Sequence, residues 1–344
     1  MVLPVLGMLL LAGCGSRGGF TIRKIEPAAS FSLLDKSVPE QIVSYMWDFV
    51  VTDSMIIIAD YRENDLVCFR KDGEFVRRIG REGQGPGEFK ETHQLFAFKD
   101  YIAVDELGNR RLQVMTMTGE LVKIFHYGNH VLNAGVKRQN SAFDGEGNYY
   151  LATNACESEK MIKKFDKDFN LLTEFGELEY GETTKFNPYD EIALVKKRQL
   201  NPTTKNNVLL VVSENKFLYV IHLALPLVKK YDLNGKLIFE KELNLEDLAS
   251  YRRDHFIEAE NVAKDFVFKN FWYWHDAAAD SHGGVYLLFG DLKRMIIYHL
   301  SKNGDISEKY FGPEEKIRRI DYQDGVLWAF ETEGQRFYQF RIGD

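Results

Sequence analysis

An aromatic run over residues 271–274 precedes His275 and Asp276 and offers the clearest ligand chemistry in the sequence. Indole and phenol rings can stack on the C–H faces of sugars, while a neighbouring imidazole or carboxylate takes hydrogen bonds from hydroxyl groups. Trp272 and Trp274 alternate, so they can equally pack into a core and anchor a neighbouring helix. Packing is the favoured interpretation of Trp272 and Trp274, and ligand binding stays open as the alternative.

Three more residues, Trp47, Asp48 and His93, lie near the predicted starts of innermost strands or in the connectors before them. Such positions face the central channel of a ring-shaped β-fold. We expect these three side chains to belong to the same ligand-binding set.

A candidate calcium loop begins at Asp166. Asp168, Asn170 and Glu177 follow at the third, fifth and twelfth positions, where an EF-hand places oxygen ligands. The sixth position is Leu171 instead of the glycine that the loop requires, and a hairpin turn is predicted over the same residues. The turn is therefore the favoured interpretation, and no metal or other cofactor is expected.

Catalytic motifs are scarce. The Gly-x-Ser-x-Gly elbow of serine hydrolases does not occur in the sequence. Acidic residues are plentiful, but a glycosidase needs two of them at a fixed separation across one cleft, which a sequence does not reveal. No catalytic residue is assigned. A protein without enzymatic activity is the favoured prediction, and an enzyme stays open as the alternative.

The glycine-rich segment 83–87 is not a phosphate-binding loop, because no Lys-Ser or Lys-Thr follows it and no βαβ unit surrounds it. Glycine and proline interrupt regular structure, so this segment is predicted to connect two repeated units. Glu88 and Phe89 complete the connector.

The elements around these residues are repeats of short β-branched and aromatic runs separated by polar turns such as Asp72-Gly73 and Asn234-Gly235. Six units cover residues 44–80, 95–125, 141–175, 208–240, 276–311 and 317–342. The last unit has only three strands, and residues 20–25 are predicted to supply the fourth and close the ring. The chain is thus predicted to be an all-β, six-bladed β-propeller; five or seven blades, or a pair of β-sandwiches, are the alternatives.

Two segments exceed what a hairpin requires. Residues 244–267 carry apolar side chains at helical spacing and predict a helix inserted between blades four and five. Residues 180–207 form a second, charge-rich insertion. Long loops on a rigid scaffold are common places for function.

The N-terminus predicts export. Residues 1–13 are uncharged and apolar, and Leu11-Ala12-Gly13-Cys14 closely resembles a bacterial lipobox, with Cys14 as the lipidated residue and 14–19 as a tether. Residues 20–344 form the single propeller domain. No acidic cluster follows Cys14, which favours the periplasmic face of the outer membrane. Cys68 and Cys156 are predicted to be buried thiols rather than a disulfide.

The charge of the chain argues against one class of partner. The 344 residues carry a formal net charge of −7, with Lys and Arg scattered in pairs, which argues against a nucleic-acid partner.

Together, the lipobox, the connector over residues 83–89 and the repeated units resemble the six-bladed β-propeller lipoproteins of Bacteroidetes, relatives of NHL-repeat propellers. The resemblance implies an exported, membrane-tethered protein of the cell envelope associated with nutrient uptake, and it transfers no catalytic residue. The prediction is a non-catalytic protein that binds a glycan, a peptide or an envelope protein. The alternatives are a lyase or hydrolase with its site at the central mouth, and a subunit of an envelope-assembly machine.

Overall fold

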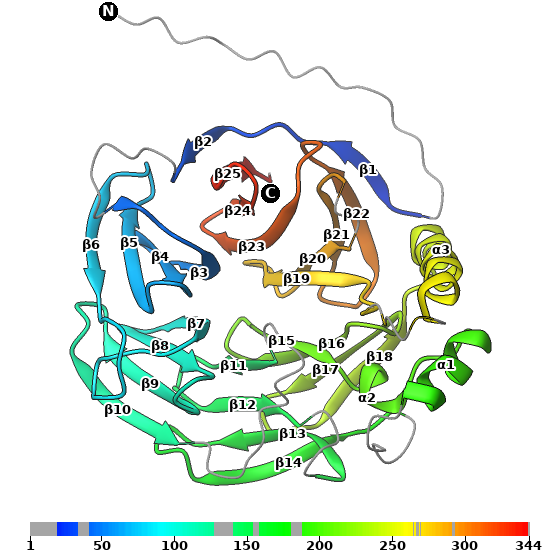
Figure 1. The fold of residues 1–344 in the computed structure, drawn as a ribbon, viewed down its shortest axis with the longest axis horizontal. Helices are drawn as coiled ribbons and strands as arrows, with labels where there is room; N and C mark the ends of the chain where they lie inside the picture. The colour runs from blue at the N-terminus through cyan, green and yellow to red at the C-terminus, as the bar shows by residue number, and fades with distance from the viewer. Residues whose placement is uncertain are drawn as a thin grey trace, which may run out of the picture.

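Six β-sheets are arranged as blades around a central channel in the computed structural model (Figure 1). The structure describes residues 19–33, 41–126, 140–153, 158–179, 188–263, 265, 268, 270–290 and 293–342. The predicted all-β, six-bladed propeller is therefore confirmed.

Each blade runs from an innermost strand at the channel to an outermost strand at the rim. The first three blades contain β3 (Met46–Val51), β4 (Met55–Asp60), β5 (Asp65–Arg70) and β6 (Phe75–Ile79); β7 (Thr92–Phe98), β8 (Tyr101–Glu106), β9 (Arg111–Thr116) and β10 (Leu121–His126); and β11 (Ser141–Phe143), β12 (Tyr149–Ala152), β13 (Lys160–Phe165) and β14 (Leu171–Glu177). The other three contain β15 (Val208–Ser213), β16 (Phe217–His222), β17 (Leu227–Asp232) and β18 (Leu237–Glu242); β19 (Trp274–Ala279), β20 (Val285–Phe289), β21 (Ile296–Leu300) and β22 (Ile306–Phe311); and β23 (Ile317–Gln323), β24 (Val326–Glu331) and β25 (Arg336–Arg341).

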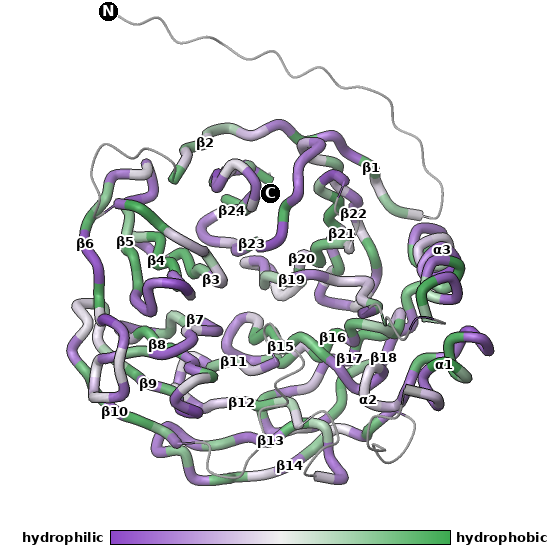
Figure 2. The backbone as a smooth tube through the Cα atoms, viewed as in Figure 1, coloured by the Kyte–Doolittle hydropathy of each residue, from purple (hydrophilic) through white to green (hydrophobic). Residues whose placement is uncertain are grey.

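Hydrophobic patterning follows position within the blade. In β4, five of six residues are buried because the strand has neighbours on both edges and blades on both faces. In the outermost β18, exposed and half-buried residues alternate. Figure 2 shows the same trend, with apolar strands within the blades and polar segments joining them.

Turn glycines allow adjacent blades to approach closely. Asp232 caps the hairpin turn between β17 and β18 by accepting hydrogen bonds from the backbone N–H groups of Asn234 and Lys236, both at 2.9 Å. Gly235 in this turn has φ +88°, and a Cβ there would lie 2.6 Å from the ring of Phe175 in the preceding blade. The Asn-Gly turn that the sequence predicted thus has a second role, which is to seat one blade on the next.

Ring closure uses an N-terminal strand, but not the predicted one. β2 (Ala29–Ser32) pairs antiparallel with β25 and completes the last blade. The predicted segment 20–25 instead contains β1 (Thr21–Lys24), which pairs in parallel with β22 and adds a fifth strand to the fifth blade. Alternation of apolar and polar residues suits any exposed sheet edge, so the pattern could not distinguish these two edges.

Among the residues that the structure describes, the α-helices lie in the two predicted insertions. α3 (Glu246–Ala263) lies between β18 and β19 and buries Leu248, Phe256, Ala259 and Ala263. The predicted helix is therefore confirmed with a shorter span. α1 (Pro188–Lys196) and α2 (Pro202–Lys205) form in the other insertion, and Val195 of α1 packs against α3.

Cys68 is a fully buried free thiol, as predicted, and burial raises its pKa to about 11. Cys14 and Cys156 lie outside the described residues. Within the described part of the chain, none of the helices has both the length and the apolar character needed to cross a membrane.

Candidate functional site

Four innermost strands begin with a β-bulge at the same end of the channel. At these bulges the strand register skips Trp47 in β3, His93 in β7, His275 in β19 and Arg318 in β23. A bulge redirects the side chain of its extra residue and often lies beside a functional site. Three of these residues were predicted from the sequence. Arg318 was not, although aligning the last repeat with the first would have found it.

Directly after each bulge comes a polar residue that joins neighbouring innermost strands. Asp48 accepts a hydrogen bond through Oδ2 from the backbone N–H of Leu95 at 3.0 Å, and Asp276 accepts one from Ile320 at 2.8 Å. Arg319 lies between both carboxylates, with Nε 3.3 Å from Asp48 Oδ1 and Nη1 3.3 Å from Asp276 Oδ1. The predicted residues Asp48 and Asp276 are thus engaged in holding the ring together.

One carboxyl group in the channel, that of Asp321, has a pKa well above the ordinary value of an aspartate. Asp321 accepts hydrogen bonds from the backbone N–H groups of Val51 at 2.7 Å and Tyr322 at 2.8 Å. Burial raises the pKa of Asp321 to about 7, and the nearby charges of Asp276 and Asp48 add to that shift despite the two hydrogen bonds. The side chain lines a channel cavity of about 220 Å³ between the innermost strands.

An aromatic hollow adjoins the bulge ring at the first blade. The ring of Trp47 lies 5.2 Å from Tyr61, 5.5 Å from His93 and 6.0 Å from Tyr45, measured between centroids. Tyr45 is 44% exposed, so its ring is accessible. The hollow has a volume of about 540 Å³ and is lined by Tyr45, Trp47, Tyr61, Arg62, Asn64, Glu82, Lys90 and Glu91.

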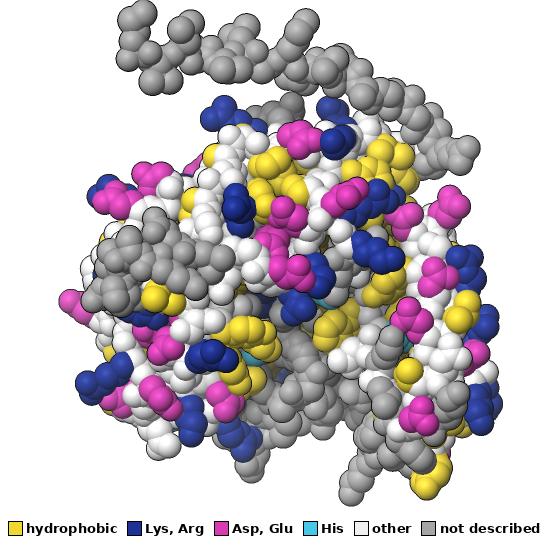
Figure 3. All heavy atoms as spheres, turned by 45° about the horizontal axis from the view of Figure 1, so that its top comes forward, with side chains coloured by type: hydrophobic (Ala, Val, Ile, Leu, Met, Phe, Trp, Pro, Cys, Tyr) yellow, Lys and Arg dark blue, Asp and Glu magenta, His cyan; other side chains and the backbone are white. Residues whose placement is uncertain are grey.

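Tyr61 sits where apolar and charged surfaces meet. Partial burial raises the pKa of its hydroxyl group, with Glu91 and Tyr45 contributing. Over the face of the molecule seen in Figure 3, basic and acidic side chains alternate without a field of one sign. The lining of the hollow also carries both signs of charge, with Arg62, Lys90, Glu82 and Glu91, and such a lining fits a neutral or weakly charged ligand better than a polyanion.

The aromatic run of residues 271–274 is mainly structural. Trp274 is fully buried, with its ring centroid 6.1 Å from Phe289 and 5.9 Å from Tyr298. Trp272 is half-buried and packs against the same core, which also contains residues of α3. The expectation of a ligand-stacking surface is therefore corrected at Trp274, because the indole ring anchors the inserted helix to the blade core.

The calcium-loop candidates are used by other interactions. Asp166 caps the β13–β14 turn by accepting hydrogen bonds from the backbone N–H groups of Asp168 at 2.8 Å and Asn170 at 2.9 Å. Glu177 lies at the far end of β14 and pairs with Lys160 at 2.5 Å. In the part of the chain that the structure describes, no group of three His, Cys, Asp or Glu side chains is arranged to hold a metal ion.

A Ser–His–Asp arrangement occurs in the fifth blade, away from the bulge ring. His299 lies 2.6 Å from both Ser307 Oγ and Asp280 Oδ2. Asp280 also accepts hydrogen bonds from the backbone N–H groups of His282 and Gly284, so it caps a turn. Burial opposes ionisation of Asp280, but the bond from His299 and these backbone bonds together lower its pKa. The trio thus ties β19, β21 and β22 together.

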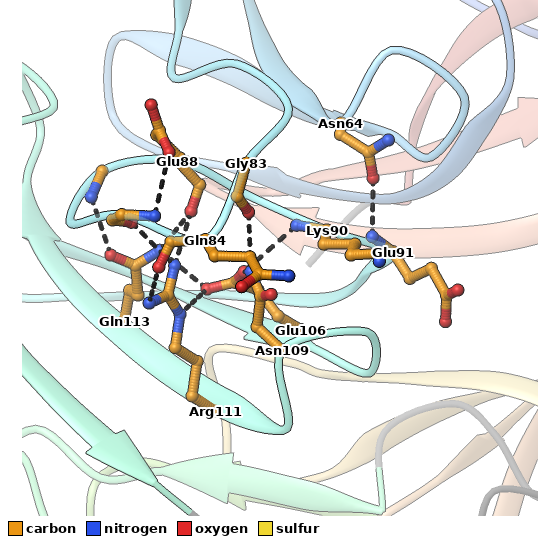
Figure 4. Close-up of polar contacts among 12 residues, drawn as sticks. Asn64, Gly83, Gln84, Glu88, Lys90, Glu91, Glu106, Asn109, Arg111 and Gln113 are labelled. Atoms are coloured by element: carbon orange, nitrogen blue, oxygen red, sulfur yellow. Dashed lines mark hydrogen bonds and ion pairs between the residues drawn. The ribbon is translucent and has the colours of Figure 1, made fainter.

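The glycine-rich connector is held in place by polar side chains of the second blade, among them Arg111, Gln113 and Asn109 (Figure 4). Arg111 donates hydrogen bonds to the carbonyl oxygens of Gln84, Gly85 and Glu88, each at 2.8 Å, and pairs with buried Glu106 at 2.9 Å. Since these backbone carbonyls face Arg111, the loop has no cradle of N–H donors for a phosphate. The predicted connector role is supported.

Comparison with known proteins supports the fold. Residues 41–203 match a family model described as a 6-bladed beta-propeller. A Bacteroides fragilis protein inferred to be exported is 13% identical, with a TM-score of 0.57 over 90% of this chain and 88% of that one. Virginiamycin B lyase from Staphylococcus aureus is 10% identical, with a TM-score of 0.54 over 92% and 99%. A protein from Bacteroides vulgatus is 10% identical, with a TM-score of 0.52 over 91% and 95%. No curated protein matches the chain significantly.

Proposed function

We propose that this six-bladed propeller is an exported, lipid-anchored binding protein that holds a glycan at the aromatic hollow without transforming it. The observation that carries the proposal is the cluster of Tyr45, Trp47 and Tyr61 around a hollow of about 540 Å³. Rings that are partly exposed beside a cavity can contact a ligand, whereas the buried ring of Trp274 cannot.

A glycan suits the composition of this hollow. Aromatic faces offer apolar contact to sugar rings, and the polar rim offers both donors and acceptors for hydroxyl groups. Arg62 and Lys90 supply donors, while Glu82 and Glu91 supply acceptors. Since the rim carries both signs of charge, affinity does not require a strongly charged ligand. A peptide is the competing occupant and is tested alongside.

The anchor part of the proposal rests on Leu11-Ala12-Gly13-Cys14. A thioether-linked lipid on Cys14 would tether the propeller to the outer membrane, with the periplasmic face favoured. The test is cell fractionation: Cys14→Ala should move the protein from the membrane fraction to the soluble fraction. Unchanged membrane association of the variant would rule out this anchor.

The binding test is a thermal-shift screen of the purified chain against neutral gluco-oligosaccharides and unstructured peptides. A ligand that binds only the folded state raises the unfolding midpoint with its concentration. An oligosaccharide should raise the midpoint of the parent chain and lose that effect in Tyr45→Ala. Tyr189→Ala serves as the control, because Tyr189 is 72% exposed on α1 and lies outside the hollow. If only peptides raise the unfolding midpoint, the hollow is a peptide-binding site. If an oligosaccharide raises the midpoint equally in Tyr45→Ala and Tyr189→Ala, it binds outside the hollow.

One observation favours the enzyme alternative. Burial in the channel raises the pKa of Asp321 to about 7, the range in which general acid–base catalysts work best. Both of its oxygens accept backbone hydrogen bonds, and these hold it to β3 and β23. If the propeller is a lyase or hydrolase, product release from the bound oligosaccharide should be lost in Asp321→Asn and follow the titration of Asp321.

The envelope-assembly alternative draws less support. Its expected signature is one broad apolar patch. The large apolar side chains that are exposed on β-strands in the described part of the chain lie on outermost strands of four different blades: Val76, Leu121, Val122, Leu171, Leu172, Leu237 and Ile238. These strands belong to four separate blades placed around the ring (Figure 1), so the exposed apolar residues are divided among several blades.

A further inference from the structure

A second, smaller cavity lies on the other side of the Tyr45 and Trp47 pair. It has a volume of about 170 Å³ and is located between the first and last blades, where the ring closes. Its lining is Tyr45, Met46, Trp47, Arg318, Arg319, Phe330, Thr332 and Gln335. Two of these residues are arginines and none is acidic.

Both guanidinium groups carry donor atoms that are not used within the described part of the chain. Arg318 Nε and Arg319 Nη2 are buried and have no hydrogen-bond partner among the described residues. Arg319 is otherwise engaged through its contacts with Asp48 and Asp276. Arg318, the bulge residue of β23, lines the cavity and has no carboxylate partner in the described residues.

A buried donor without a partner loses the hydrogen bonds that it would make in water. A ligand that supplies acceptor atoms at this place would recover them. Gln335 adds an amide whose buried Oε1 has no partner in the described structure, and a half-turn of that amide presents two further donors. Thr332 adds a hydroxyl group to the lining.

We propose that this cavity is an oxyanion-binding subsite, with Arg318 as its principal ligand-contacting residue. The group bound is a carboxylate or a sulfate ester, because arginine pairs with planar or tetrahedral oxyanions through two parallel N–H donors. The cavity shares Tyr45 and Trp47 with the aromatic hollow. This inference rests on the proposed function, since the two cavities together would hold one ligand. That ligand is an acidic glycan, whose charged group enters beside Arg318 while a sugar ring contacts the aromatic cluster.

The subsite can be tested without a glycan. Sodium sulfate and sodium acetate are titrated separately into the purified full-length chain at constant ionic strength, with tryptophan fluorescence as the readout because Trp47 forms one wall. A saturable change is expected for at least one of the two anions. Sulfate and acetate also distinguish the two chemical sources of the oxyanion.

Arg318→Gln should weaken the binding of the responsive anion by about tenfold or more, as expected for loss of charged hydrogen bonds. Arg318→Lys keeps the positive charge but lacks the two parallel N–H donors of the guanidinium group. Its affinity for the anion should therefore lie between those of the parent and Arg318→Gln. The control Arg70→Gln makes the same change in charge at an exposed ion pair with Glu74, and it should leave binding unchanged. The unfolding midpoint of each variant confirms that it is folded.

Two results would overturn the subsite: absence of saturable binding by both anions, or unchanged affinity in folded Arg318→Gln. A third comparison separates this inference from the proposed function. Glucuronate-containing oligosaccharides should bind more tightly than their neutral counterparts, and Arg318→Gln should abolish only that difference. Equal affinity for both would contradict the acidic-glycan inference and leave glycan binding intact. Anion binding that depends on Arg318 without any glycan binding would support the subsite and contradict the glycan proposal.

Discussion

The Nε atom of Arg319 lies 3.3 Å from Oδ1 of Asp48, across the seam where the last blade meets the first. The side chains of these two residues are 1% and 9% exposed, so their charges are shielded from water. The same Arg319 side chain also contacts Asp276 of the fifth blade. One cation therefore joins three consecutive innermost strands at the place where the ring closes.

Removing that cation should be costly. Arg319→Met leaves the carboxylates of Asp48 and Asp276 buried without a counter-charge, and breaking a buried pair in this way costs about 3–5 kcal/mol. We expect a loss of that order in the free energy of unfolding measured with urea. Arg70→Met is the control, because an exposed pair contributes only about 0–1 kcal/mol. A loss no larger than that of the control would show that the seam does not depend on Arg319.

Truncation from the N-terminus should distinguish the two N-terminal strands. A chain beginning at residue 27 loses β1 but keeps β2, whereas a chain beginning at residue 41 loses both. β2 completes the last blade, and Phe31 stacks on Phe337 with a centroid distance of 5.2 Å. The shorter chain should therefore unfold at a much lower temperature, or fail to fold, while the longer one stays close to the parent. Similar midpoints for the two truncated chains would contradict closure by β2.

Two glycines between β6 and β7 provide a matched pair. Gly80 has φ +80°, and a Cβ there would lie 2.2 Å from the buried ring of Phe89. Gly87 has φ +73°, but a Cβ there would meet no atom within 4 Å. Both alanine substitutions strain the backbone, and only Gly80→Ala adds a steric clash. Calorimetry should give a clearly larger drop in the unfolding midpoint for Gly80→Ala than for Gly87→Ala. Equal drops would show that backbone strain alone causes the loss of stability.

These comparisons indicate which features a sequence can predict. Repeated strands and Asp-Gly or Asn-Gly turns depend on local chemistry, so the blade count and the turn at Asn234-Gly235 followed from the residues. Choosing the closing strand required knowing which sheet edge was free, and residues 20–25 fit either edge. Local patterns could not decide between the two.

The candidate site was predictable only in part. Trp47, His93 and His275 were found because their residue types are suggestive, and the structure places them at equivalent bulges. Arg318 was missed because a single arginine beside another arginine looks like an ordinary charged surface pair. The sequence favoured packing for Trp274 but could not exclude ligand binding, because burial of an indole ring depends on packing between α3 and the fifth blade, which lies beyond any local pattern.

The acidity of Asp321 should give the fold a pH-dependent stability that an uncharged variant lacks. Burial raises the pKa of Asp321 in the folded protein to about 7, above the ordinary value of an aspartate in the unfolded chain. Between those two pKa values the folded state binds a proton that the unfolded state has released. Its contribution to stability therefore falls as the pH rises through this window and stays constant above about pH 7.

Asp321→Asn cannot titrate, so its stability relative to the parent should increase between about pH 5 and about pH 8. The measurement is the difference in unfolding midpoint between variant and parent across this range, because other titrating groups cancel in the difference. Asp100→Asn, which removes one carboxylate from an exposed turn, is measured in parallel as the control for the substitution itself. A pH-independent difference for Asp321→Asn would mean that this carboxylate ionises normally in the channel, which would also remove the observation favouring acid–base chemistry there.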